Sequence, residues 1–105
     1  MLCIVPQIEI IAEREAAKRW EFDVQILDDA GGLHRVMMTL TWADYNLWSA
    51  DGADEPAKVA EAVLWFLLHP SRSCPSALPA KFDASLARRK FPDDADAVIP
   101  TLIRR

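Results

Sequence analysis

Apolar and polar residues alternate along two stretches in the first half of the chain, 20–28 and 33–41. Alternation with a period of two places successive side chains on opposite faces, which predicts two β-strands that each bury one face. The apolar positions are all even-numbered: Trp20, Phe22, Val24, Ile26, Val36, Met38 and Leu40.

The even numbering of these positions also constrains the loop that joins the two strands. Paired residues of an antiparallel hairpin share a face, so the loop must have an odd number of residues. We predict the three-residue loop Ala30-Gly31-Gly32, with Asp29 opposite Leu33 and a glycine at positive φ.

The stretch before the hairpin, 7–14, fits a helix through Ile8 and Ile11 or a strand through Ile8 and Ile10. Its cluster of β-branched residues favours the strand. With the hairpin, this strand gives a three-stranded antiparallel meander over 7–14, 20–28 and 33–41.

Helical patterns fill the second half of the chain. Thr41 is the expected N-cap of a short helix over 42–49, and Asp54 or Glu55 precedes a longer helix over 56–69. That longer helix begins amphipathic and ends apolar on all sides. We therefore expect the C-terminal segment to cover its second half.

The C-terminal segment carries two further helix signals. Asp83 can cap a helix that runs to about Lys90, and Asp93 or Asp94 can cap a last short helix. Pro100 predicts that the last helix is broken or restarts there.

Strands that precede helices indicate an α+β fold rather than alternating β-α-β units. The predicted architecture is a three-stranded antiparallel meander followed by three to four helices packed on one face. We expect a single domain over 1–105, with the sheet in 7–41 and the helical part in 42–105.

The composition changes this picture little. Of 105 residues, 51% are apolar, which is enough for a core without disulfides, so we interpret Cys3 and Cys74 as free thiols in a reducing compartment. The apolar start of the chain stops at Pro6 without a basic region, and the longest apolar run, 62–68, is too short to span a bilayer. The expectation is a soluble, cytoplasmic protein with no membrane contact.

The charge is unevenly distributed. Residues 1–80 hold six Lys and Arg against twelve Asp and Glu, a net −6, whereas residues 81–105 hold six against four, a net +2. The acidic balance argues against binding a nucleic-acid backbone, except through the basic C-terminal segment.

Five short motifs follow one another along 8–103: His34 with Val36, Phe66-Leu67-Leu68, Phe82-Asp83, Phe91-Pro92 and the acidic turn 93–99. With these motifs the chain resembles a family of small bacterial proteins of unknown function. The family pattern is a β-hairpin, a helix that ends in Phe-Leu-Leu, and a C-terminal Phe-Asp…Phe-Pro signature. The resemblance implies a fold and no chemistry.

Residues with catalytic or metal-binding potential are few. His34, early in the third strand, is a candidate polar site, although a structural histidine bonded across the hairpin explains it as well. His69 and Cys74 are too few ligands for zinc, and the acidic groups fit turns and helix starts better than calcium loops. We predict no catalytic residues, no metal and no cofactor.

The run Arg88-Arg89-Lys90 is the main basic concentration and a candidate phosphate contact. A solvated face of a short helix explains the same residues. No Gly-rich phosphate loop or nucleic-acid-binding motif accompanies them.

Trp42, Tyr45 and Trp48 recur every three residues on the predicted short helix. Trp and Tyr dominate the contacts that determine protein–protein affinity, so this row is a candidate partner-binding surface, although part of it should lie in the core. The preferred hypothesis is therefore a non-enzymatic protein-binding or assembly module, with an unidentified protein or a second copy of itself as partner. The alternatives are a nucleic-acid-associated regulator that uses the basic segment and, ranked below it, a small enzyme around His34.

Overall fold

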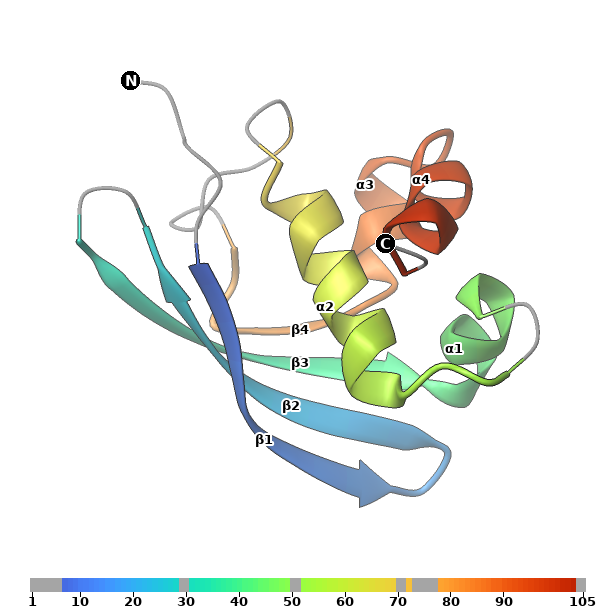
Figure 1. Ribbon diagram of the computed structural model, residues 1–105, viewed down its shortest axis with the longest axis horizontal. Helices are drawn as coiled ribbons and strands as arrows, with labels where there is room; N and C mark the ends of the chain where they lie inside the picture. The colour runs from blue at the N-terminus through green and yellow to red at the C-terminus, as the bar shows by residue number, and fades with distance from the viewer. Residues whose placement is uncertain (1–6, 29–30, 50–51, 70–71, 73–77, 104–105) are drawn as a thin grey trace.

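The computed structural model describes residues 7–28, 31–49, 52–69, 72 and 78–103. The elements follow in the order β1 (Gln7–Ala16), β2 (Arg19–Leu27), β3 (Leu33–Thr41), α1 (Trp42–Trp48), α2 (Pro56–Leu67), β4 (Lys81–Asp83), α3 (Leu86–Lys90) and α4 (Ala95–Ile103). The strands form one sheet in the order β1-β2-β3-β4 (Figure 1). The predicted α+β class is confirmed, with four strands instead of three. Within the described ranges, no helix is long and apolar enough to cross a membrane.

Strands β2 and β3 pair antiparallel, as their alternation predicts. Phe22 lies opposite Met38 and Val24 opposite Val36, and all four side chains are buried on the face that the helices cover. The last pair of the ladder is Leu27 with Leu33, so the predicted pairing of Leu33 with Asp29 is wrong. The even-number parity holds, but the register is displaced by two residues.

Asp28 explains the displaced register. Its backbone N–H donates to the Gly32 carbonyl at 2.9 Å, and its carboxylate accepts the Gly32 N–H at 2.6 Å. The pair that closes the loop is thus Asp28 with Gly32. Each residue of this pair lies one position before its counterpart in the predicted pair, Asp29 with Leu33. Gly31 has a φ of +86°, as expected of a glycine in this loop.

Strand β1 confirms the strand interpretation of the first stretch and extends to Ala16. Ile8 and Ile10 lie opposite Ile26 and Val24 on the inner face. A β-bulge between Ile10 and Ala12 then shifts the register, which leaves the extra residue exposed on the edge of the sheet.

Strand β4 is the element that the pattern did not predict. It pairs parallel to β3, with Phe82 beside Met38 and Asp83 beside Thr39. Asp83 therefore ends a strand instead of capping a helix, although its carboxylate still accepts the Ser85 backbone N–H at 2.9 Å. The helix expected from Asp83 is shorter and begins at Leu86 as α3.

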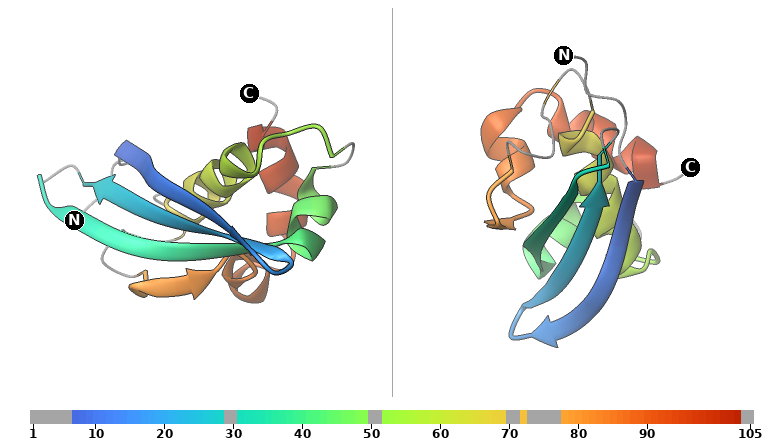
Figure 2. Two further views of the ribbon diagram at one scale, coloured as in Figure 1. Left: turned by 90° about the horizontal axis from the view of Figure 1, so that it is seen from below. Right: turned by 90° about the vertical axis from the view of Figure 1, so that its left-hand side faces the viewer.

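The helices build a second layer against one face of strands β1–β3 (Figures 1 and 2). Helix α2 lies across the sheet and buries Val59, Val63 and Phe66. Helix α4 packs on α2 from the other side, which confirms that the C-terminal segment covers the apolar half of α2.

The boundaries of three helices test the cap predictions. Thr41 caps α1, since its Oγ1 accepts the Asp44 N–H at 3.2 Å. Glu55 is the N-cap of α2, without a side-chain bond, and α2 ends two residues before the predicted His69. Helix α4 runs through Pro100 without a break, so the predicted break is wrong.

Pro100 lies inside α4, where a proline costs one backbone bond and crowds the carbonyl four residues earlier. Proline removes the N–H that would reach the carbonyl four residues earlier. Ile99 and Ile103 on the same helix are both buried and hold α4 against the core. The apolar burial on either side of Pro100 thus offsets the missing bond.

Candidate functional site

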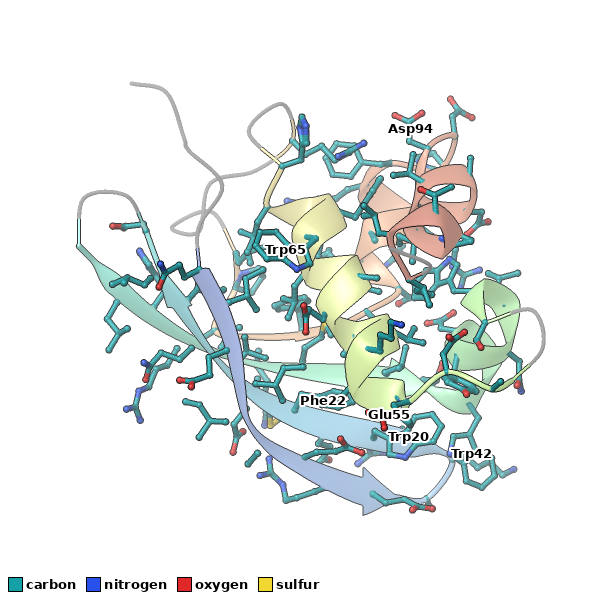
Figure 3. The ribbon with its side chains drawn as sticks, viewed as in Figure 1. Trp20, Phe22, Trp42, Glu55, Trp65 and Asp94 are labelled. Atoms are coloured by element: carbon teal, nitrogen blue, oxygen red, sulfur yellow. The ribbon has the colours of Figure 1, made fainter. Side chains whose placement is uncertain are left out.

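The predicted aromatic row becomes a three-ring cluster at one end of the sheet. The Trp20 ring centroid lies 5.2 Å from that of Tyr45 and 6.4 Å from that of Trp42. Figure 3 shows Trp20 and Trp42 together where β2 begins and α1 follows β3. We call Trp20, Trp42 and Tyr45 the aromatic corner.

The aromatic corner has a fixed base and an exposed tip. The Tyr45 hydroxyl donates to the Gly52 carbonyl at 3.0 Å and contacts the Asp54 carbonyl, which anchors the ring. Trp42 rests on Trp20 and remains 43% exposed. Trp20 was not among the predicted binding residues, because its place in a strand alternation indicated only core.

Trp48, the third member of the predicted row, does not belong to this surface. It is 1% exposed, and its indole N–H donates to an Asp96 carboxylate oxygen at 3.0 Å. On a short helix that packs on α4, this position points into the core. Trp48 is therefore part of the core, and of the predicted row only Trp42 and Tyr45 belong to the aromatic corner.

The basic run of α3 is divided between the interior and the surface. Arg88 turns inward and forms an ion pair with Asp44, which is only 3% exposed. Arg89 and Lys90 remain exposed. Arg88 thus has a structural partner, and the phosphate contact predicted for Arg88, Arg89 and Lys90 stays a prediction.

In the Asp44–Arg88 pair, the attraction of opposite charges does not fully compensate the burial of the carboxylate. Burial raises the pKa of the Asp44 carboxyl, and the Arg88 charge offsets only part of that rise. The Arg88 Nε is buried and has no hydrogen-bond partner among the described residues. The two residues lie 44 positions apart, so no local pattern signals the pair.

Asp83 lies near this pair and behaves in the opposite way. Burial acts to raise its pKa, but hydrogen bonds from Ser85 and Thr39 outweigh burial and hold the pKa below its usual value. The Thr39 hydroxyl donates to Asp83 at 2.6 Å. These bonds stabilise the ionised carboxylate of Asp83 at the end of β4.

His34 has a clear structural partner. Its Nε2 lies 2.8 Å from an Asp28 carboxylate oxygen, and the other oxygen accepts the Gly32 N–H. His34 is partly buried and lines none of three cavities found among the described residues. The geometry therefore places His34 in the closure of the β2–β3 loop.

The outer face of the sheet carries a row of ion pairs. Arg14 lies 2.8 Å from Asp23 and 3.6 Å from Glu21, which also pairs with Arg19 at 3.2 Å. Helices α2 and α4 lie on the opposite face of strands β1–β3 (Figure 2). The charged side chains of Arg14, Arg19, Glu21 and Asp23 on this outer surface are thus paired with one another.

The largest of the three cavities is a groove of about 630 Å³ between α2 and α4. It was not predicted from the sequence, since α4 must first fold onto α2 to create it. Its lining combines apolar and charged side chains: Lys58, Glu61, Ala62, Trp65, His69, Arg72, Val98, Thr101 and Leu102.

The described residues contain no group of three or more His, Cys, Asp or Glu that could hold a metal ion. Cys3 and Cys74 lie outside the described residues, so their predicted state as free thiols stays a prediction. Comparisons with protein families, curated proteins and solved structures found no match for this chain.

Proposed function

We propose that this protein is a non-enzymatic protein-binding or assembly module whose contact surface is the aromatic corner. The observation that carries the proposal is Trp42, which is 43% exposed and packs on Trp20, whose ring is itself in contact with Tyr45. Single exposed apolar side chains are common on protein surfaces. The packing of the core, however, does not require an exposed tryptophan that rests on another aromatic ring.

The fixed base favours binding because it lowers the entropic cost of association. The carbonyl contacts of Tyr45 hold its ring against Trp20, and Trp20 in turn supports Trp42. A preorganised aromatic side chain loses little conformational freedom when a partner covers it. Tryptophan and tyrosine are also the residues most often responsible for interface affinity.

The test compares Trp42→Ala with Leu47→Ala, since both side chains are exposed on α1, by 43% and 47%. Each immobilised variant is exposed to lysate of the source organism, and self-association is followed by sedimentation velocity. We expect the wild type to retain one protein, or to form a dimer, with a definite stoichiometry. Trp42→Ala should weaken this binding by about 2 kcal/mol or more, while Leu47→Ala retains it.

Equal binding by the two variants would contradict the aromatic corner as the contact surface. Absence of any partner and of self-association would contradict the binding module itself. Circular dichroism of both variants checks that the fold is intact.

A further inference from the structure

The groove between α2 and α4 combines an apolar floor with cationic ends. Ala62 and Trp65 from α2 face Val98 and Leu102 from α4 across it. Lys58 lies toward the start of α2, and Arg72 lies beyond its end. The apolar side chains are thus flanked by positive charge in the direction of the helix axis.

The α2 side of the groove is one continuous stripe. Positions 58, 61, 62 and 65 follow the three- and four-residue spacing of a single helix face. From position 58 to position 65 this face extends about 10 Å along the helix axis, and His69 and Arg72 line the groove beyond the end of α2. The groove is therefore elongated, with a length similar to that of a medium-length acyl chain.

Arg72 is held in position before any ligand arrives. Its guanidinium lies 3.9 Å from the ring centroid of Phe66, and its Nη1 donates to the Phe66 carbonyl at 3.1 Å. A guanidinium has five N–H donors, and among the described residues the Phe66 carbonyl accepts one of them, so others can reach an anion. A cation fixed in this way binds an anion with little further ordering.

The charge of the lining favours an anionic ligand. Lys58 and Arg72 outnumber the one carboxylate, Glu61, whose Oε1 already accepts the Trp65 indole N–H at 3.3 Å. The chain as a whole has a net charge of −4, so a positive lining is a local departure from its overall balance. An opposite charge on the ligand would complement it.

We propose that this groove binds a small anionic amphiphile, with its apolar chain along the floor and its carboxylate at Arg72. The cavity volume of about 630 Å³ lies within the range typical of small-molecule sites. Cations at both ends favour a ligand of the groove's own length over a longer peptide that would have to pass them. The groove shares no residue with the aromatic corner and is a second site.

Dodecanoate below its micelle concentration is the probe. We expect saturable 1:1 binding by calorimetry and a shift of the Trp65 indole N–H signal in ¹⁵N NMR spectra, assigned with Trp65→Phe. The indole signal of buried Trp48 serves as the internal reference. Dodecyltrimethylammonium, which has the same chain and a cationic head, should bind at least about tenfold more weakly.

Two variants locate the head group and the groove. Arg72→Gln removes the cation and should weaken dodecanoate binding by about tenfold. Thr101→Glu adds a carboxylate at an exposed position of the lining and should weaken binding without disturbing the core. Arg35→Gln, an exposed arginine on the sheet, is the matched control and should bind like the wild type.

Five results would overturn the proposal, four of which concern binding of the probe. These are absence of saturable binding, equal binding of the cationic amphiphile, unchanged binding by Thr101→Glu, and binding of an acidic amphipathic peptide in place of dodecanoate. Dimerisation that Thr101→Glu abolishes would assign the groove to a second copy and would overturn the proposal as well. If Arg72→Gln does not fold, the Thr101→Glu result alone decides where the probe binds.

Discussion

Among single residues, Asp44 and Arg88 join the start of α1 to α3 through a charge pair that is buried on one side. Asp44 is 3% exposed, whereas the Arg88 side chain is 38% exposed and its guanidinium carbon lies 5.8 Å from the centroid of the Trp48 ring. A buried carboxylate left without its cation is costly, because neither water nor a partner compensates its charge. We therefore expect this pair to contribute more to the stability of the α1–α3 contact than an exposed arginine on a basic helix would.

Arg88→Met should lower the free energy of unfolding by about 2 kcal/mol, below the loss for a wholly buried pair because Arg88 is partly in water. Arg89→Met, the next position on the same helix, is exposed and should change stability by less than about 0.5 kcal/mol. Urea unfolding of both variants measures the difference. Similar losses in the two would show that Asp44 does not depend on Arg88.

Asp83 gives a pH dependence of defined sign. Its pKa is lowered in the folded protein, so its contribution to stability is complete above the ordinary carboxyl range and is lost as the pH falls through the folded pKa. Between about pH 5 and pH 3, the wild type should lose more unfolding free energy than Asp83→Asn does. Urea unfolding at several pH values gives the two curves.

Thr39→Val provides the intermediate case for Asp83. It removes the hydroxyl that donates to Asp83 at 2.6 Å, so the pKa of Asp83 should rise toward its usual value. Its acid sensitivity should fall between that of the wild type and that of Asp83→Asn. Parallel curves for all three proteins would show that other carboxylates determine the acid response.

Among the elements, α1 depends on its cap more than a longer helix would. It has seven residues and follows β3 without a loop, so Thr41 must end the strand and start the helix. Thr41→Ala should cost about 1 kcal/mol, because the Asp44 N–H loses its acceptor at 3.2 Å. Thr41→Ser keeps the hydroxyl and should retain most of the stability, as thermal unfolding would show; equal losses would instead indicate lost packing.

Elements with a strong local signal could be predicted from the sequence, and those that depend on distant contacts could not. The alternation of β2 and β3 and the cap at Thr41 are local, and both were confirmed. Strand β4 has three residues and one buried side chain, Phe82, and it exists only because β3 is beside it. The predicted register of the β2–β3 loop was wrong for a similar reason. The Asp28 side chain, instead of a backbone carbonyl, accepts the Gly32 N–H.

The candidate site shows the same division. Tyr45 and Trp42 could be placed on one helix face, but the support from Trp20 and the burial of Trp48 depend on how α1 meets β2 and α4. The resemblance to a family of small bacterial proteins stays a prediction. Two residues of its signature, Phe66 and Phe91, pack edge to face in the core with centroids 5.7 Å apart.

At the scale of the whole molecule, the aromatic corner and the groove are two surfaces on one rigid core. The corner is built from β2 and α1, and the groove from α2, α4 and Arg72. A close-packed interior connects them, yet neither surface shares a side chain with the other. Variants at separate sites of this kind usually have additive effects on stability.

We therefore expect the unfolding free energies of Trp42→Ala, Thr101→Glu and the double variant to add within about 0.5 kcal/mol. Dodecanoate affinity in Trp42→Ala should stay within about twofold of the wild type, since no residue of the aromatic corner touches the groove. A larger change would mean that α1 transmits binding to α4, and the bond from Trp48 to Asp96 would be the first connection to test. Trp48→Phe removes that donor but keeps a buried ring, so it would abolish such coupling while leaving the two sites in place.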